Sequence, residues 1–324
     1  MRKLTQKLVL SVVTMALVVV ALGTSTFAWF TLQNSASIGE FDASVTAGEG
    51  IEVSLGTWDD TSNVATLETN SQWYTVIPDT VIQQRLTDMY GSSLSLTDAT
   101  SSNGILIQKR SLVDGSLSNL SNMSGGYVEF KVWFRSGEQQ TITLVNAAIT
   151  GSEVNWVVDA PFRAADKDDF ATGTSLTVGQ TIKVGAWTAA RLSIFNQAGT
   201  VGGVFQREAH PSTNLTNEAS NSVAAPELSY AAAGRFGAAS YYFAKTAGSQ
   251  IAAPTSQVIP VATQVPASGL LTSPVPVLLL SQSAAGEPYL GNIVVRVWIE
   301  GWDADLFDAL FDTGLTVSLQ FGVL

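Results

Sequence analysis

Residues Tyr127–Phe134 read YVEFKVWF, and this stretch decides the fold class of the chain. Aliphatic and phenyl side chains take every second position: Val128, Phe130, Val132 and Phe134. Glu129, Lys131 and Trp133 take the positions between them. Successive side chains of a β-strand point to opposite faces, so the pattern predicts a strand with one face in a core and the other toward solvent. The Trp133 ring is expected on the outward face.

The same alternation recurs along the chain and predicts an all-β protein. Further strands are expected at Ile51–Leu55, Thr141–Val145, Val154–Val158, Thr181–Val184, Arg191–Phe195 and Leu315–Phe321. Helices are expected at only two places, Thr80–Tyr90 and Asp303–Asp312, and the second has an apolar stripe and an acidic first turn. Many alternating strands with few helices favour an antiparallel β-sandwich, and we assign residues 29–324 to one such domain.

Two of the expected strands resemble each other. Tyr127–Gly137 (YVEFKVWFRSG) aligns with Asn292–Trp302 (NIVVRVWIEGW), and the pair Val-Trp falls at the same place in both. Strands of such similar pattern could be equivalent strands in the two halves of a sandwich. Chance similarity between short alternating strands is the competing explanation.

One stretch of the domain lacks this alternation. Residues 231–288 are rich in Ala, Ser and Pro, with prolines at positions 254, 260, 266, 274 and 276. Proline has no backbone donor and is confined to edge strands and bulges, so a continuous central strand is not expected there. We predict a long loop around 231–288, either wrapped over the core or inserted into the domain.

The composition indicates a protein that associates with itself and does not bind nucleic acid. The 324 residues carry a formal net charge of −11, and 13% of them are charged, against about 25% in an ordinary soluble domain. Binding a polyanion needs clusters of Lys and Arg, so no nucleic-acid partner is expected. The absence of cysteine excludes disulfides and thiolate metal sites. Low charge and 46% apolar content suit a subunit of a homo-oligomer or filament.

The first thirty residues have the pattern of a secretory targeting segment. A positive start is provided by Arg2, Lys3 and Lys7. The apolar run Leu8–Leu22 and several small residues follow, so we predict cleavage between Ala28 and Trp29, with residues 1–28 as a signal peptide. The alternative is an apolar helix kept as a membrane anchor, since about 20 residues span a bilayer. In both cases the rest of the chain lies outside the cell, and the membrane is contacted only through this segment.

The sequence offers little catalytic chemistry, and we expect no enzyme activity. His210 is the only histidine, so a zinc-protease helix with two histidines is excluded, and no G-x-S-x-G nucleophile motif is present. Two acids flanking a sugar suffice for glycoside hydrolysis, and Glu300 with Asp303 is the nearest such pair. Trp298 and Trp302 lie beside these acids in the sequence. A helix cap next to core tryptophans is the explanation that we prefer.

Calcium is the one cofactor for which ligand clusters occur in the sequence. Acidic residues gather at Asp59–Asp60, Asp166–Asp169 and Asp303–Asp305, and Ca²⁺ favours loop carboxylates. None of these clusters has the twelve-residue spacing of an EF-hand. Solvated acidic loops are the simpler explanation, so no cofactor is expected.

Both ends of the chain resemble those of a known family. Gly23–Thr31 reads GTSTFAWFT, and Ser37–Phe41 reads SIGEF. These motifs are similar to the start of the TasA/camelysin group, and Val295–Asp305 (VRVWIEGWDAD) resembles a strand-to-helix ending of such exported β proteins. The resemblance implies secretion from a Gram-positive bacterium through a SipW-type signal peptidase. It also implies a jelly-roll-like β-sandwich and extracellular or biofilm-matrix fibres.

The resemblance further implies a way of assembling, because some relatives pass an N-terminal strand into the next subunit. Carried onto this chain, the donor strand is Trp29–Phe41, with the candidate side chains Trp29, Phe30, Leu32, Ile38 and Phe41. An open sheet edge can accept such a strand by main-chain pairing. Head-to-tail addition is a heterologous contact that propagates into a filament. The leading hypothesis is therefore a secreted structural subunit of an extracellular fibre.

Two other functions remain open at this stage. One is a cell-surface adhesin or carbohydrate-binding protein, for which Trp133 and Trp302 are the candidate surface-binding aromatics. The other is a virion or surface-layer component that keeps residues 1–28 as a membrane anchor.

Overall fold

The computed structural model describes most of the chain after residue 35. The described residues are 36–37, 41–59, 62, 64–91, 95–111, 116–120, 126–164, 174–207, 237–246, 262–301, 303, 310 and 313–324. The chain divides into two units, Met1–Ser35 and Ala36–Leu324, and only the second contains described residues. The predicted signal peptide or anchor and the cleavage site at Ala28 and Trp29 therefore lie outside the described residues.

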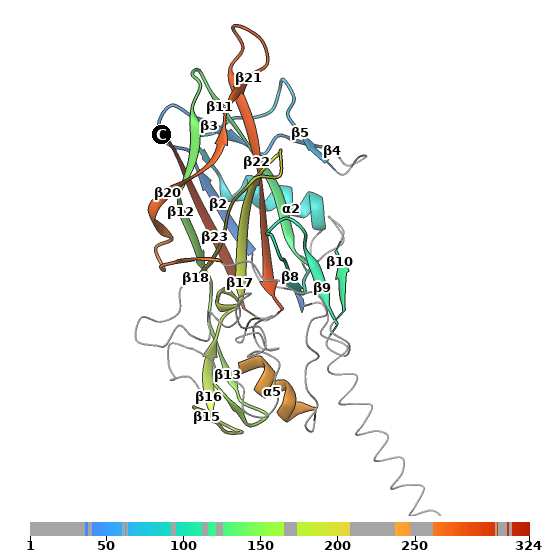
Figure 1. The fold of residues 1–324 in the computed structure, drawn as a ribbon. Coiled ribbons are helices and arrows are strands. Elements are labelled where there is room, and N and C mark those ends of the chain that lie inside the picture. The colour runs from blue at the N-terminus through green and yellow to red at the C-terminus, as the bar shows by residue number, and fades with distance from the viewer. Residues whose placement is uncertain are drawn as a thin grey trace, which may run out of the picture. The chain divides into compact units, whose positions relative to one another are not determined.

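Two β-sheets form the body of the second unit, and most of their strand pairs are antiparallel (Figure 1). The smaller sheet has the strand order β20 (Leu270–Leu279), β12 (Thr141–Thr150), β23 (Leu315–Val323), β2 (Phe41–Thr46) and β6 (Val76–Ile77). Its one parallel pair is β2 with β23. The all-β, sandwich-like fold predicted from the alternation is confirmed.

The larger sheet has ten strands around one long strand, β22 (Tyr289–Glu300). One path leads from β22 through β17 (Ala190–Asn196) and β18 (Val201–Arg207) to β19 (Thr263–Val265). Another leads through β8 (Asp98–Thr100) and β9 (Gln108–Arg110) to β10 (Leu117–Asn119). β11 (Val128–Ser136) connects β22 to β3 (Glu52–Ser54), and β21 (Ser281–Gln282) pairs with the start of β22.

The two look-alike stretches are direct neighbours in this larger sheet. β11 runs antiparallel to β22, with Val128 opposite Val297 and Val132 opposite Ile293. The proposal that they are equivalent strands in two halves of the sandwich is therefore wrong. Their similarity has a physical reason, because both strands present one apolar face to the same core and one polar face to the same side. Glu129 of β11 accordingly lies opposite Arg296 of β22, and the two form an ion pair.

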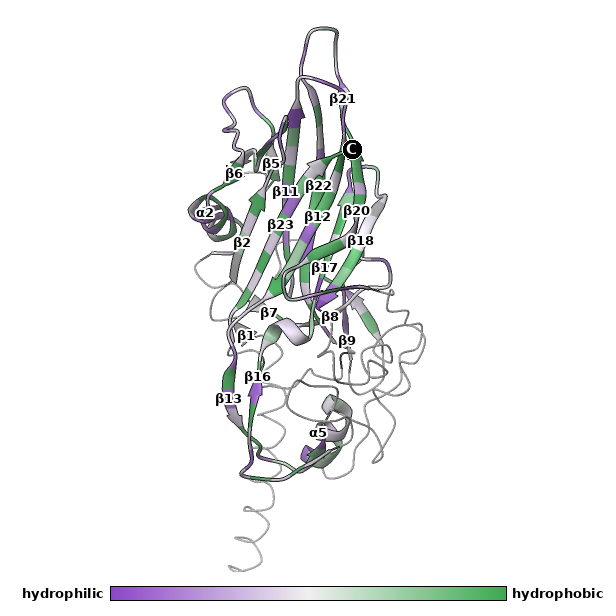
Figure 2. Cartoon of the chain, turned by 90° about the vertical axis from the view of Figure 1, so that its left-hand side faces the viewer, coloured by the Kyte–Doolittle hydropathy of each residue, from purple (hydrophilic) through white to green (hydrophobic). Residues whose placement is uncertain are grey.

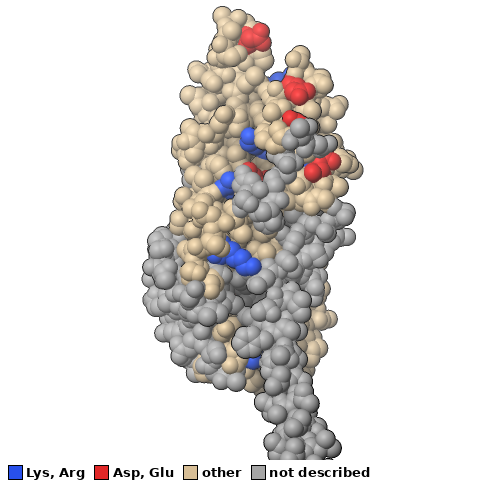
Figure 3. Space-filling model, turned by 90° about the vertical axis from the view of Figure 1, so that its right-hand side faces the viewer, with Lys and Arg blue, Asp and Glu red and all other residues tan. Residues whose placement is uncertain are grey.

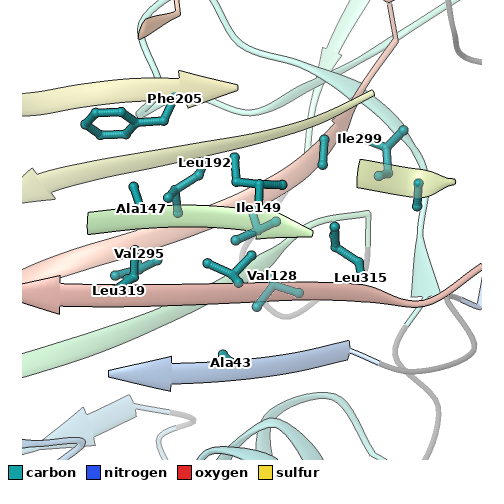
Figure 4. Packing of buried hydrophobic residues seen from close by; sticks show 14 of the residues in the cluster. Ala43, Val128, Ala147, Ile149, Leu192, Phe205, Val295, Ile299, Leu315 and Leu319 are labelled. Atoms are coloured by element: carbon teal, nitrogen blue, oxygen red, sulfur yellow. The ribbon is translucent and has the colours of Figure 1, made fainter. Parts of the chain in front are cut away.

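The core lies between the two sheets. Phe134 of β11 and Phe321 of β23 meet edge to face, with ring centroids 5.0 Å apart. Figure 4 shows buried side chains of both sheets in one layer, among them Ala43, Val128, Ala147, Ile149, Leu192, Phe205, Val295, Ile299, Leu315 and Leu319. Burying each larger aliphatic or aromatic side chain contributes about 1.5–3 kcal/mol. The apolar residues of the alternating pattern, such as those of β11, are thus the ones that point into this layer.

The helix predicted at Thr80–Tyr90 is confirmed as α2 (Asp79–Tyr90). Its buried face carries Ile82 and Leu86, which join the core. Arg85 lies on the same side and donates hydrogen bonds to the carbonyl oxygens of Leu55 and Gly56, at 2.5 and 3.0 Å. These contacts fix α2 beside β2 and the chain that follows β3. The second expected helix, Asp303–Asp312, lies mostly outside the described residues.

The region around 231–288 is not one long loop. It contains the helix α5 (Gly237–Lys245) and the strands β19, β20 and β21. β20 holds Pro274 and Pro276 and is the edge strand of the five-stranded sheet, so proline excludes a central strand as expected but not an edge strand. β20 begins after Gly269, whose φ of +72° suits glycine. A Cβ at Gly269 would lie 2.2 Å from the backbone nitrogen of Ala148 in β12.

A smaller β-ribbon follows β12 in the chain. Its strands are β13 (Val154–Val157) with β16 (Thr181–Val184), and β14 (Phe162–Arg163) with β15 (Ser175–Leu176), followed by the short helix η1 (Ala186–Thr188). α5 packs on this ribbon (Figure 1). Two more short pairs are β1 (Ala36–Ser37) with β7 (Ser95–Leu96), and β4 (Thr57–Asp59) with β5 (Val64–Thr66).

Candidate assembly surface

The five-stranded sheet has an outer face with almost no charge. Among the residues of its five strands, Asp42 is the only Asp, Glu, Lys or Arg. Outward positions of the central strands β12, β23 and β2 are instead held by small or uncharged side chains: Ser44, Thr46, Thr141, Asn146, Ala148, Thr150, Thr316, Ser318 and Gln320. Figure 2 shows β2, β23, β12 and β20 side by side. We call this side of the sheet the uncharged face.

One row of side chains crosses the whole uncharged face. Strand register places Leu270, Asn146, Gln320, Thr46 and Val76 opposite one another on β20, β12, β23, β2 and β6. Directly paired residues of neighbouring strands point to the same face, so all five belong to the outer side. The row ends in two exposed aliphatic side chains, Leu270 at 63% and Val76 at 50%. It has an uncharged polar centre between two apolar margins.

A second row at one end of the sheet is also apolar. Leu279 of β20 pairs with Thr141 of β12, and the backbone nitrogen of Leu324 donates to the Thr141 carbonyl oxygen at 3.1 Å. Leu279 is 60% exposed and Leu324 is 77% exposed. Apart from Asp42, the outward residues of the central strands between and beyond the two rows carry hydroxyl or methyl groups, and the Ser44 and Ser318 hydroxyls are hydrogen-bonded at 2.9 Å. Depletion of charge is the compositional mark of the centre of a protein–protein interface, so this face is a candidate contact surface.

Both edge strands of the same sheet have features that limit pairing with another strand. β20 forms one edge, where Pro274 and Pro276 interrupt the row of backbone donors. The other edge is β6, which has only two residues, Val76 and Ile77. Proline and short length are common ways of limiting pairing at an edge strand. The outer face is therefore a broader candidate contact than either edge.

Charge is placed instead on the other sheet and its surroundings. Figure 3, which views the side opposite to that of Figure 2, shows Lys, Arg, Asp and Glu among the described residues. Arg135 of β11 contacts Glu52 of β3 at 2.5 Å, and its guanidinium lies 4.5 Å from the ring centre of Trp73. Arg296 pairs with Glu129. The two sides of the sandwich are thus chemically distinct, with ion pairs on one and none of the described ion pairs on the strands of the uncharged face.

The predicted donor strand is only partly described, and its end needs a correction. Phe41 is the first residue of β2 and pairs with Leu315 of the same chain, so it already occupies a place in its own sheet. Ala36 and Ser37 likewise pair with β7. Trp29, Phe30, Leu32 and Ile38 lie outside the described residues. A strand given to a neighbour without unfolding these pairs must come from before residue 36.

The prediction that Trp133 lies exposed on the sheet surface is wrong. The residue is 7% exposed. The sequence placed its ring correctly on the side opposite to Val132, but the chain after β3 covers that side. A Cβ on Gly56 would come within 3.0 Å of the Trp133 ring, and the ammonium of Lys131 lies 6.0 Å from the ring centre. The second candidate aromatic, Trp302, lies outside the described residues.

Glu300 and Asp303 are both buried, which bears on the carboxylate hypothesis. The Trp298 indole nitrogen donates to Glu300 Oε2 at 3.0 Å, and Arg191 Nη2 contacts Asp303 Oδ2 at 2.7 Å. The side chains of Arg191 and Asp303 are 3% and 0% exposed. In this arrangement no sugar reaches either carboxylate, so the pair gives no support to glycoside hydrolysis. Asp303 is held by an arginine, an interaction that the helix-cap explanation did not foresee.

The described segments contain no group of three or more His, Asp or Glu residues that could hold a metal ion. His210, Asp60, Asp166–Asp169 and Asp305 fall outside those segments. Within the same segments no helix is long and apolar enough to cross a membrane.

Comparison with known proteins gives no match. No protein-family model matches the sequence, no curated protein matches it, and no solved structure matches the fold.

The uncharged face was not recognised from the sequence, although a signal for it exists. β23 reads LTVSLQFGV, in which Thr316, Ser318 and Gln320 alternate with core residues and no charge appears. β12 reads TITLVNAAIT and likewise has no charge. Only the strand order, which places these two strands and β2 next to each other, turns separate uncharged strands into one continuous surface.

Proposed function

We propose that this protein is a secreted structural subunit of an extracellular filament or matrix fibre. The observation that supports this best is the uncharged face with its exposed Val76, Leu270, Leu279 and Leu324. A chain with a net charge of −11 that leaves one broad sheet face without charge has a surface suited to association. The targeting pattern of residues 1–28 and the resemblance to the TasA/camelysin group agree with this function.

The filament grows by donation of the N-terminal segment to the next subunit. Phe41 belongs to β2, and Ala36–Ser37 pairs with β7, so we take residues 29–35 of the predicted donor Trp29–Phe41 as the donated part. Phe30 and Leu32 have the spacing of two side chains on one face of a strand, which is what pockets along an acceptor edge require. Because donor and acceptor are different surfaces, each addition leaves a new acceptor free and the assembly propagates.

The test is a double substitution within residues 29–35. Phe30→Asp with Leu32→Asp places charges where the acceptor would bury apolar side chains, so we expect loss of fibres in negative-stain images of the exported protein. The matched control, Thr31→Asp with Gln33→Glu, adds the same charge on the opposite face of the same strand and should retain fibres. Fibres formed as readily by the first variant as by the unmodified chain would rule out donation by this segment.

The adhesin hypothesis has lost one of its two residues, since Trp133 is covered. The membrane-anchored surface or virion component differs from the fibre subunit in a single measurable property, which is retention of residues 1–28 in the mature protein.

A further inference from the structure

We propose that two copies of the chain pair through their uncharged faces around a two-fold axis. This inference rests on the proposed function, because it assigns the lateral contact between subunits of a fibre. The longitudinal contact is made by residues 29–35, and a second, independent contact is what joins one row of subunits to another. The partner to which we commit is a second copy of this chain.

Among the described surfaces, the distribution of charged residues favours the uncharged face as the contact between two copies. Two copies that each carry −11 repel each other, and the repulsion is weakest where the facing surfaces hold no charge. On the ten-stranded sheet, the part-exposed side chains of Glu52, Lys131 and Arg135 would have to lose water in a contact made there. The five strands of the uncharged face contain a single charged residue, Asp42, near the start of β2. Fewer charges must therefore be desolvated at this face.

The row across the face is self-complementary under a two-fold axis. Gln320 lies on β23, the middle strand of the five, while Leu270 and Val76 lie on the two edge strands. An axis that runs along β23, midway between two facing sheets, carries Leu270 of one copy over Val76 of the other. The same operation places Gln320 opposite Gln320 of the second copy. The contact then has two exposed aliphatic pairs at its margins and an amide pair at its centre.

The side chains between these points allow close approach. Ser44, Thr46, Ala148 and Ser318 are small, and sheets that pack face to face lie about 10 Å apart. A glutamine amide has both donor and acceptor atoms, so the Gln320 side chains of the two copies can hydrogen-bond to each other across the axis. The pairing therefore buries exposed aliphatic side chains without leaving a charged group unpaired at the centre.

The experiment uses charge exchange at Gln320 in the full exported chain carrying Phe30→Asp and Leu32→Asp, so that fibre growth does not obscure the pair. Sedimentation should give twice the mass that intact-mass analysis finds for the exported chain. Gln320→Lys, and separately Gln320→Glu, should raise the dissociation constant about tenfold or more, because each places like charges face to face. An equimolar mixture of the two should restore the affinity to within about threefold of the starting chain. Ser118→Lys, at an exposed position on β10 of the ten-stranded sheet, should change nothing.

The outcomes separate this inference from the proposed function. A starting chain that remains monomeric, single variants that pair normally, or a mixture that stays dissociated would each overturn the two-fold pairing. Fibres in the chain without the Phe30 and Leu32 substitutions, with unchanged width after Gln320→Lys, would overturn the lateral contact and leave the fibre function standing. Paired subunits without fibres in that chain would overturn the fibre function and leave the two-fold pairing standing.

Discussion

Arg191 and Asp303 form a buried ion pair on the side of β17 that faces away from the core between the sheets, with both side chains at most 3% exposed and Nη2 to Oδ2 at 2.7 Å. Replacing Arg191 with Leu removes the guanidinium from a buried carboxylate, and we expect a loss of about 3–5 kcal/mol in the free energy of unfolding, measured by urea denaturation. The control is Lys183→Leu, which breaks the exposed Lys183–Glu153 pair at 3.8 Å and should change stability very little. Similar small losses in both variants would show that the buried pair is dispensable.

The buried Tyr127 and the half-buried Tyr90 should make the protein sensitive to high pH. Burial raises the pKa of Tyr127 to about 12 and also raises the pKa of Tyr90 above its ordinary value. Unfolded tyrosines ionise near pH 10, so above that pH the unfolded chain holds fewer protons than the folded one and is favoured. The stabilisation is therefore complete below about pH 10 and is lost as the pH rises toward about 12.

The substitution that tests this pH dependence is Tyr90→Phe. The Tyr90 hydroxyl accepts from the Glu129 backbone nitrogen at 2.7 Å, so the variant should be less stable at pH 7. Between about pH 10 and 12 it should lose less stability than the parent, because one of the two raised groups is gone. Equal slopes of the urea midpoint against pH in the two proteins would contradict the assignment.

Single residues were the least predictable part of this protein. Alternation placed Trp133 on the correct side of its strand but could not show that the chain near Gly56 returns over it. The same limit applied to Asp303, whose arginine partner is 112 positions away in the sequence. Burial and long-range ion pairs depend on which segments meet, and no local pattern records that.

At the scale of elements, α5 and the ribbon form a unit whose docking can be tested. Tyr241 of α5 packs against Trp156 and Phe162, with ring centroids 5.6 and 5.4 Å away. Its hydroxyl donates to Asp159 at 3.0 Å, and Lys245 contacts the same carboxylate at 2.8 Å. Removing the ring removes the packing and one hydrogen bond together, so Tyr241→Ala should release α5 from the ribbon.

Hydrogen exchange measures this release. We expect backbone amides of α5 to lose protection about tenfold or more in Tyr241→Ala, while amides of β12 and β22 stay protected. Lys245→Ala removes only the partly exposed ammonium and should have a much smaller effect. Loss of protection throughout the sandwich would show that the ribbon and the sheets unfold as one unit.

Elements with a strong period were predicted well, and β20 shows why others were not. β11 and α2 carry periods of two and of about 3.6 residues, and both appear within a few residues of their expected places. β12 begins at Thr141 as expected but continues to Thr150, beyond the expected end at Val145. β20 has prolines and a bulged register against β12, so its alternation is broken even though it is a strand. An edge strand pairs on one side only and can hold prolines, whereas in a central strand each proline would remove a hydrogen bond of the ladder.

At the scale of the molecule, the charged residues and the proposed contact surface lie on different sheets of the sandwich. Ion pairs such as Glu129–Arg296 and Glu52–Arg135 lie on the ten-stranded sheet, whereas the five-stranded sheet presents hydroxyl, amide and aliphatic groups. The composition predicted a self-associating chain of low charge, but strand order was needed to show where the low charge is concentrated. We expect this face, and not the charged one, to be covered in the assembled state.

The most direct test of the central claim is made on protein recovered from outside the producing cells. Intact-mass analysis gives the N-terminal residue, and negative-stain imaging of the same sample shows whether fibres are present. An exported fibre subunit predicts a chain that starts at or near Trp29 and forms fibres. A chain that keeps Met1 and is found in membranes without fibres would contradict the account and favour an anchored surface component.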